Sequence, residues 1–550
     1  MFEKVLVKSP KRARHDFSHG NTLSMVFGKL TPTELRFIVP GDDVSVSMEQ
    51  IVRVAPMPVP TFVNMKVRHD WFFVPLSMMY DQQSLDLLLS NTPSSYHRFA
   101  CNKLTDYLKI FTDYNSADYG EFGSAEPFVP GSIHDYFNLP VFTDISCTQG
   151  GSPNTDFQTF KSSPSQTNYA ALLANTTVKA VTDDLPGPIL EPHLAFHYIW
   201  RDWYRFTGMD SSLAGTTNTP GVPDYWVENH IINTYLVQNY VQGNYPNWAQ
   251  YSVSSQRIHG VAGMRSYLAA NYFAYLKKDE FTSARYGTKP QVLIPTGASG
   301  TIPNLRTASA LQKFIDLVSV SGQRYWDKVK ALFNETPSGM KCERAQFLAR
   351  YMSYIKVGEV ITTATTTQAQ TGDYAGRGML VDGRYLFKRH FTEHGWLMCV
   401  SSIVPEMAYN GYDRQLTDTN ILDTPIPSFA SIGDQSVFNR EIRVLYDGSG
   451  HKNNDSFGDQ FRYYAYKSDV NRIHGDFLMS SFSAWTAILP ADQYLRFNAR
   501  DFSAVFPIVW NKLFDVTLSK NPFFTGRFFV DLTFHEFITR NLPKYVSYAL

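Results

Sequence analysis

Alternation of apolar and polar residues near both ends of the chain is the feature that most constrains its fold. Near the start it runs through Val44–Glu49 (VSVSME) and Met65–Phe72 (MKVRHDWF), and near the end through Phe528–His535 (FFVDLTFH). A period of two is typical of a β-strand with one face buried and one face more polar. We therefore predict strands at both ends of the chain, and we expect the first and last strands to pair.

A proline-rich segment, VAPMPVPTF, separates the first two of these predicted strands. Its prolines, at 56, 58 and 60, have no backbone N–H to donate to a sheet. We therefore expect this segment to be an extended crossing piece or an edge.

The middle of the chain shows helical spacing instead. Apolar residues recur at i, i+3, i+4 and i+7, which is typical of one face of a helix, and we expect these stripes to be core. They are Leu104, Tyr107, Leu108 and Phe111, then Leu311, Phe314, Ile315 and Val318, continued after Gly322 by Tyr325, Val329, Leu332 and Phe333. No repeat of fixed period is present, which argues against a solenoid or a propeller.

Two long stretches have the composition of loops. Thr143–Pro188 is rich in Ser, Thr, Asn and Pro, and Gly208–Pro223 reads GMDSSLAGTTNTPGVP. Loops of this length inside an ordered chain are usually functional or exposed.

The charge composition limits the kinds of partner. In 550 residues, Lys plus Arg and Asp plus Glu are both 50, so the formal net charge is +0 and any nucleic-acid contact must be local. Charged residues make up 18% and aromatic residues 15%. Depleted charge and enriched aromatics are typical of interface centres, and a large β-rich core would give the same composition.

The cysteines and the first residues indicate the compartment. Cys101, Cys147, Cys342 and Cys399 form no CxxC pair, so we expect reduced thiols rather than a disulfide framework or a zinc site. Basic residues near the start are not followed by the apolar stretch of a secretory signal. The apolar run Trp396–Val404 has about half of the ~20 residues needed to cross a membrane. The sequence therefore predicts a chain without a membrane span that folds in a cytoplasm.

The segment HFTEH, residues 390–394, fits the zinc signature H-x-x-E-H. Gly395 follows at once, and β-branched and aromatic residues continue to Pro405, so we predict a turn that enters a strand. On a strand, residues four apart are roughly 13 Å apart, too far to share one ion. No GxSxG, GxxxxGK[ST] or EF-hand pattern is present. We therefore expect no metal site, no cofactor and no catalytic residue.

A basic arm, residues 1–16, is the one candidate contact with nucleic acid. Its basic side chains, set against Glu3 and Asp16, give a net charge of +3, and they could neutralise a few phosphates without reading sequence. The candidate residues are Lys4, Lys8, Lys11, Arg12 and Arg14. The alternative is a solvated terminus whose charges have no specific role.

Ordered motifs along nearly the whole chain resemble the major capsid proteins of the microviruses, small isometric single-stranded DNA phages, and especially their gokushovirus-like branch. Near the start these are FSHGNTLSMVFGKLTPTELRFIVPGDDV, VRVAPMPVPTF and DWFFVPLSMMY. They continue with PGSIHDYFNLP, HYIWRDWYR, KKDEFTSARYGTKPQ, SGQRYWDKV, EHGWLMCVSSIVP, PSFASIGDQSVFNREI and FGDQFRYYAYKSDVNRIHGDF. Two features depart from the family: the helical segment lacks its Gly-Gly-Thr, and residues 143–188 and 207–260 are longer than expected.

The resemblance implies an all-β core with helical insertions, namely an eight-stranded antiparallel jelly roll of the viral capsid type with long inter-strand loops. Residues 17–550 would form this single domain, with surface-exposed or projecting insertions at 143–188 and 207–260. The chain would be a non-enzymatic structural protein of the virion, which self-assembles in the bacterial host cytoplasm into a sixty-copy T=1 icosahedral shell. It would enclose a circular single-stranded DNA genome and present loops to a host surface receptor.

Further partners are expected from the same resemblance. They are a small basic DNA-packaging protein, and pilot and scaffolding proteins. Two other classes stay open on the sequence: a jelly-roll carbohydrate-binding surface protein, and a metallopeptidase acting through His390, Glu393 and His394.

Overall fold

The computed structural model describes about half of the chain. The described residues are 12–25, 27, 30–79, 133–138, 148–162, 171, 191–204, 302–337, 344–361, 374–442, 444, 452–487, 513–514 and 527–544, apart from 323, 418–419, 455 and 483. All structural statements below concern these residues.

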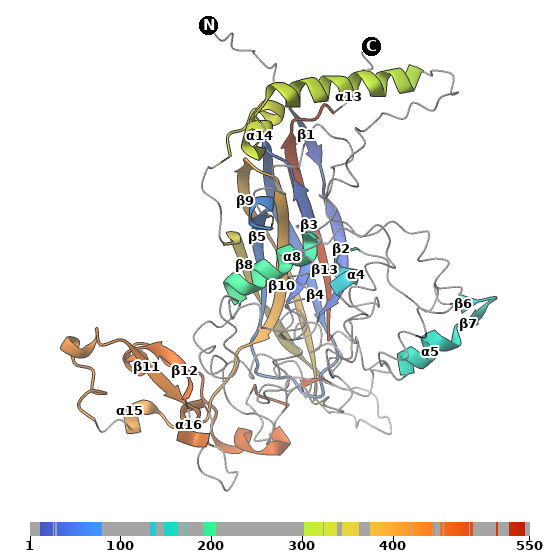
Figure 1. Cartoon of the computed structure of the whole chain (residues 1–550). Coiled ribbons are helices and arrows are strands. Elements are labelled where there is room, and N and C mark those ends of the chain that lie inside the picture. The colour runs from blue at the N-terminus through green and yellow to red at the C-terminus, as the bar shows by residue number, and fades with distance from the viewer. Residues whose placement is uncertain are drawn as a thin grey trace.

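One curled antiparallel sheet forms the centre of the molecule (Figure 1). Its strands are β1 (Ala13–Asp16), β2 (His19–Met25), β3 (Thr31–Ile38), β4 (Asp42–Val54), β5 (Met65–Pro75), β8 (Gln346–Ile361), β9 (Tyr374–Phe391), β10 (Gly395–Pro405) and β13 (Phe528–Arg540). β1 and β2 pair with successive parts of β13, so the nine strands occupy eight positions.

The pairing is that of one long hairpin rolled up on itself. In chain order, the first position (β1 with β2) pairs the last (β13), the second (β3) pairs the seventh (β10), the third (β4) pairs the sixth (β9), and the fourth (β5) pairs the fifth (β8). Rolling adds the pairs β13–β4, β10–β5 and β8–β9. This is the strand order of a jelly roll, so the predicted fold class is confirmed.

β8 pairs with strands of both layers and so connects them. Its first part, up to Ile355, pairs with β5, and its second part, from Lys356, pairs with β9. The two layers are therefore β1/β2–β13–β4–β9 and β8–β5–β10–β3, with their inner faces turned toward each other.

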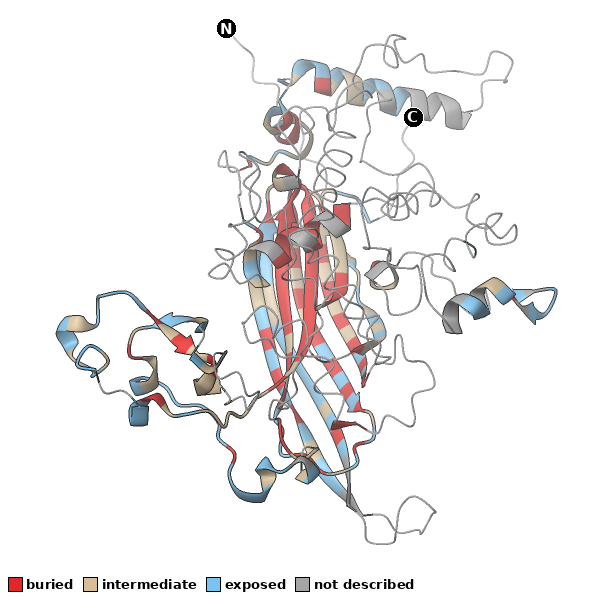
Figure 2. Ribbon diagram, turned by 60° about the horizontal axis from the view of Figure 1, so that its bottom comes forward, coloured by how far each residue is buried: buried red, intermediate tan, exposed pale blue. Residues whose placement is uncertain are grey.

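The core lies between these layers. β4 and β13 each bury every second residue, such as Val44 and Val46 on β4 and Leu532 and Phe534 on β13. They meet inward-facing residues of β5 and β10, including Trp71 and Leu397. Figure 2 shows this alternation of buried and exposed residues along the strands.

A second apolar cluster covers the outer face of β5 and β10. It joins Phe72, Val74 and Met398 to residues of two helices, α8 (Glu191–Ile199) and α14 (Tyr325–Phe333). β5 and β10 are therefore buried on both faces, and the burial pattern of β10 is nearly continuous. Short helical pieces adjoin this layer: α1 (Leu76–Met79), α4 (Ile133–Tyr136) and the π-helical turn η4 (Trp200–Tyr204).

The remaining elements lie outside the two layers. α13 (Ile302–Val320) crosses the end of the sheet at which β1 begins and β13 ends, as Figure 1 shows. A small outlying unit comprises β6 (Thr148–Gln149), β7 (Ser152–Pro153) and α5 (Thr155–Ser162). A larger lobe holds α15 (Arg414–Thr417), η10 (Pro427–Phe429), β11 (Asp434–Phe438), α16 (Asn439–Ile442), η11 (Lys452–Asn454), β12 (Ser456–Phe461), η12 (Tyr464–Tyr466), η13 (Gly475–Leu478) and η14 (Ser480–Phe482).

The predicted strands are confirmed, and the first and last strands pair as expected. The prolines 56, 58 and 60 lie in the non-strand segment between β4 and β5. One detail is wrong: β5 has a more polar face only in its first half, because from His69 onward every residue is buried. α8 and η4 cover the outer face of this part of β5, which explains the difference.

The predicted helices at 311–318 and 325–333 are α13 and α14. Tyr325 and Val329 are buried as expected, whereas Phe314 and Ile315 of α13 are only half-buried. The stripe at 104–111 lies outside the described residues. Among the described helices, none combines the length and apolarity that crossing a membrane requires.

Candidate functional site

In the part of the chain that the structure describes, β2 and β3 lie at the two edges of the rolled sheet, and polar side chains join them. Asn21 of β2 donates from Nδ2 to the backbone carbonyl of Thr33 on β3, at 2.7 Å. His19 Nε2 lies 2.6 Å from Glu34 Oε2, also across the two strands. We call this line of side-chain contacts the seam. Along the seam, side-chain contacts rather than backbone hydrogen bonds link the two layers.

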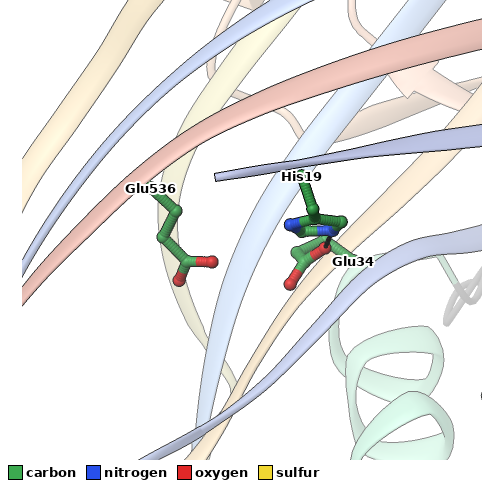
Figure 3. A group of neighbouring side chains, drawn as sticks. All are labelled: His19, Glu34 and Glu536. Carbon is green, nitrogen blue, oxygen red and sulfur yellow. Dashed lines mark ion pairs between the residues drawn. The ribbon is translucent and has the colours of Figure 1, made fainter. Parts of the chain in front are cut away.

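A four-residue charge cluster forms the middle of the seam, and Figure 3 draws three of its members, His19, Glu34 and Glu536. Arg36 of β3 donates from Nη2 to Glu34 Oε1 at 2.9 Å and lies 3.1 Å from Glu536 Oε2 of β13. Glu34 and Glu536 are 6% and 0% exposed, respectively. The His19 ring stacks on Phe534, with centroids 5.3 Å apart. Two buried carboxylates therefore lie beside a partly exposed guanidinium and a partly exposed imidazole.

Burial is the main influence on the pKa of the Glu536 carboxyl. It raises the pKa of Glu536 to about 7, although the neighbouring Arg36 opposes the shift. The hydrogen bond to Glu34 raises the pKa of His19, although partial burial opposes it. Glu536 uses Oε2 for Arg36, while its Oε1 is buried without a hydrogen-bond partner. One ligand atom from each of His19, Glu34 and Glu536 lies within 4.8 Å of the other two.

The predicted nucleic-acid contacts are only partly described. Lys4, Lys8 and Lys11 lie outside the described residues. Arg12 donates to Asp43 Oδ2 at 2.8 Å, to the Thr539 carbonyl at 3.4 Å and to the Gly41 carbonyl. Arg14 lies on strand β1, and its guanidinium carbon is 3.9 Å from the centre of the Phe537 ring. Both arginines thus contact the jelly roll itself.

The residues of the zinc-like signature have separate partners. His390, on β9, contacts Asp43 Oδ1 at 2.7 Å and Glu335 Oε2 at 3.1 Å. The Glu393 carboxylate accepts a bond of 2.8 Å from the Ser77 hydroxyl, and the Tyr325 hydroxyl lies 2.7 Å from His394 Nδ1. Residues 392–394 connect β9 to β10, which confirms the predicted turn that enters a strand.

The four cysteines are partly described as well. Cys399 is a free thiol, as predicted, and burial raises its pKa to about 12. The other three cysteines lie outside the described residues.

The outer face of the β13–β4–β9 layer exposes a row of aromatic, apolar and basic side chains. Cross-strand pairing places Phe529 opposite Arg53, Arg53 opposite Met379, and Met379 opposite Lys356. Phe529 and Met379 are about half exposed, and Arg53 and Lys356 are exposed. We call these four residues the basic–aromatic row. Exposed apolar side chains continue beside it at Ile51 and Val381, which pair with each other.

The sequence analysis missed both the charge cluster and the basic–aromatic row. A signal for the first exists in β13: the buried register Phe528, Val530, Leu532 and Phe534 continues to Glu536, so a carboxylate occupies a core position. A signal for the second is the exposed register of the same strand, which begins with the large apolar Phe529. Neither signal indicates which distant strands supply the neighbours.

Comparison with known proteins gives one family. The model of a family described as "Capsid protein (F protein)" matches residues 5–119 and 189–547. The predicted insertion 143–188 falls inside the unmatched stretch between these ranges, whereas 207–260 falls inside the matched part.

Individual relatives agree with this family. The chain is 23% identical over 522 residues to the capsid protein VP1 of Chlamydia phage 1, covering 86% of each chain. It is 22% identical over 503 residues to the capsid protein VP1 of Bdellovibrio phage phiMH2K, covering 85% of this chain and 82% of the relative. A shorter match, 25% over 185 residues, joins it to the capsid protein VP1 of Spiroplasma virus 4. The chain therefore belongs to the microvirus capsid protein (F protein) family.

Proposed function

We propose that this protein is the shell subunit of a small phage virion. Sixty copies close into a T=1 icosahedral shell around a circular single-stranded DNA genome, and surface loops attach the particle to the host. The observation that carries this proposal is membership of the capsid family together with a jelly roll whose strand pairs are complete in the described residues. A scaffold of this kind leaves its long connections free to make contacts between subunits.

The exposed apolar side chains on the outer face of the β13–β4–β9 layer support an inner, DNA-facing side. Helices α8 and α14 pack on the outer face of β5 and β10, whereas β4, β9 and β13 keep large apolar side chains exposed. Single-stranded DNA is bound without sequence preference by aromatic side chains that stack on bases and by cations that track the backbone. The basic–aromatic row offers both kinds of group within four paired strands.

Charge balance implies partners. A genome of a few thousand nucleotides shared by sixty subunits gives each on the order of tens of phosphates. The chain has a formal net charge of +0, so it cannot balance them. A separate small basic packaging protein or many bound cations would therefore fill the particle. Pilot and scaffolding proteins, a host receptor, and assembly in the host cytoplasm belong to the same proposal.

Electron microscopy of the purified full-length chain tests the shell proposal. The expected result is closed particles of one diameter, alone or with the packaging and scaffolding proteins of the same phage. A chain that stays a monomer in every such mixture, or that binds sugars as a monomer, contradicts the proposal.

The DNA-facing side has its own test. Ultraviolet cross-linking of DNA-filled particles, followed by mass spectrometry, should yield DNA adducts on the peptide that contains Phe529. Replacing Phe529 with Ser should reduce these adducts. Replacing Ile421, which is exposed in the lobe outside the layers, with Ser is the matched control and should leave them unchanged. Adducts confined to other surfaces contradict the assignment of this face.

A further inference from the structure

We propose that His19, Glu34 and Glu536 form a binding site for a divalent transition-metal ion of the zinc class, which clamps β2, β3 and β13 together at the seam. The sequence did not predict a metal site at these residues. Its zinc-like segment, residues 390–394, is a different part of the chain. The inference is independent of the proposed shell function, because it concerns the closure of the subunit itself.

The three donors lie close enough together to reach one ion. One ligand atom from each residue lies within 4.8 Å of the other two, and His19 Nε2 is 2.6 Å from Glu34 Oε2. Zinc bonds to nitrogen and carboxylate oxygen of ~2.0–2.2 Å set tetrahedral ligand atoms about 3.3 Å apart. The donors therefore need to move by roughly one ångström or somewhat more to reach bonding positions, which rotation of the Glu536 and His19 side chains can supply.

The carboxylate of Glu536 supplies an independent sign of a ligand. Its Oε1 atom is buried and has no hydrogen-bond partner, although the residue is 0% exposed. A buried polar atom without a partner destabilises the folded chain, and does so more strongly when the group is charged. Figure 3 shows the Glu536 carboxylate turned toward the His19 and Glu34 side chains. A metal ion between them would satisfy this oxygen.

The surrounding bonds orient the donors as the outer contacts of metal sites usually do. His19 Nδ1 lies 2.9 Å from the Phe17 carbonyl, and a bond donated there turns Nε2 toward the carboxylates. Arg36 occupies Glu34 Oε1 and Glu536 Oε2, which leaves Glu34 Oε2, now in contact with His19 Nε2, and the unpartnered Glu536 Oε1 as the oxygens that would bind the ion. Such outer-shell bonds fix the tautomer and the direction of metal ligands.

The donor set selects the class of ion. One imidazole nitrogen with two carboxylate oxygens suits zinc and similar ions, and is poorer for calcium, which takes six to eight oxygens. The His19 side chain is 35% exposed, so solvent can supply a fourth ligand and the ion has a route of entry. The Arg36 cation opposes the ion, so we expect moderate rather than very tight binding.

Metal binding to the full-length chain tests this site. After chelation and removal of the chelator, titration with Zn²⁺ should show one ion bound per chain and a rise in the unfolding temperature. Co²⁺ in place of Zn²⁺ should give the visible absorption of a four-coordinate site with nitrogen and oxygen ligands. The variants Glu536→Gln and His19→Ala should each weaken binding at least about tenfold and remove the cobalt spectrum.

A matched control separates this site from other metal-binding groups. His535, the neighbour of Glu536 on β13, points outward and contacts Glu49 at 3.4 Å, so His535→Gln should bind the ion as the parent chain does. Two results would overturn the proposal: no stoichiometric binding of Zn²⁺ or Co²⁺, or unchanged affinity in both Glu536→Gln and His19→Ala. If Glu536→Gln fails to fold, the half-exposed His19→Ala decides alone.

Discussion

Among single residues, His69 is a titratable group that the jelly roll buries completely and holds with two hydrogen bonds. Its Nδ1 accepts from the Ser401 hydroxyl at 2.6 Å, and its Nε2 donates to Gln50 Oε1 at 2.9 Å. The ring is 0% exposed, and burial lowers its pKa to about 3. The neutral imidazole thus connects β5 to β10 and β4 inside the core.

His69 should make the subunit sensitive to acid. Because its folded pKa is below the ordinary value near 6.5, the unfolded chain takes up a proton first as the pH falls. Stability should therefore be intact above about pH 6.5 and fall by about 1.4 kcal/mol per pH unit between that value and about pH 3. Denaturant unfolding of purified subunits across this range measures the slope.

The variant His69→Gln should lose this contribution to the slope and cost about 1–3 kcal/mol at pH 7 for the altered buried hydrogen bonds. His535→Gln, at an exposed position on β13, should keep the parent slope. An unchanged slope in His69→Gln would show that other groups cause the acid sensitivity.

The candidate site could be predicted from the sequence only in part. The glutamate at 536 stands in the buried register of an alternating strand, which already indicates an unusual carboxylate. Its partners come from residues 19, 34 and 36, about 500 positions earlier, and local patterns carry no information about such distant pairing. The basic arm was visible in the sequence, but the internal contacts of Arg12 and Arg14 depend on β1 lying beside β13.

At the scale of the element, Gly395 explains why β10 begins where it does. A Cβ atom at this position would lie 2.6 Å from the Phe73 ring and 2.6 Å from the Val74 carbonyl oxygen. The carbonyl belongs to the backbone of the paired strand β5, so it cannot move aside cheaply. The glycine thus permits the close approach of β10 to β5 directly after the turn at 392–394.

Gly395→Ala should therefore destabilise the subunit by about 1–3 kcal/mol, the usual cost of overpacking a buried site. Gly358→Ala on β8 is the matched control, because its Cβ would meet the Arg377 carbonyl at 3.9 Å, an ordinary contact. That change should alter stability by no more than about 0.5 kcal/mol. Equal unfolding midpoints for the two variants in urea would contradict the close-approach argument.

Elements with one buried face were the most predictable. β4 and β13 alternate in sequence as they do in burial, and α14 follows its predicted stripe. β10 reads as a continuous apolar run because helices cover its outer face while the core covers its inner face. The polar positions of β5, such as Asp70, misled the prediction because Arg68, Tyr204 and Arg350 satisfy that carboxylate in the interior.

For the molecule as a whole, we propose that the basic arm divides into two functional parts. Replacing Lys4, Lys8 and Lys11 with Gln should lower packaged DNA while subunit stability stays at the parent value. Because single-stranded DNA releases about 0.7 counterions per neutralised phosphate, the salt dependence of DNA binding should weaken by about 2 in its log–log slope. Filter binding over a range of salt concentrations measures it.

Replacing Arg12 and Arg14 with Gln is the informative comparison. These arginines contact Asp43 and Phe537 within the subunit, so their loss should lower the unfolding temperature. Equal DNA content and salt slope in the lysine variant and the parent would show that the arm is only a solvated terminus.

The tip of the insertion at 207–260 should be dispensable for assembly. We propose that residues 207–260 project outward, near a threefold axis, with 143–188 as the competing exposed segment. Deleting residues 209–222 should leave particle yield unchanged by electron microscopy, because shortening a loop at its tip removes few contacts. A matched deletion inside 163–176 identifies which segment is needed for attachment to host cells. Failure of the first variant to form particles would make that segment an interface instead.

The position of β13 also fixes the order of events during synthesis. This strand lies between β4 and the β1/β2 edge, yet it emerges about 470 residues after β4. At a synthesis rate of ~5–20 residues per second, the edge of β4 that pairs with β13 stays open to other chains for roughly 25–95 s. Chains interrupted before residue 528 cannot close the roll, so the translation machinery delivers assembly-competent subunits only after the last strand is made.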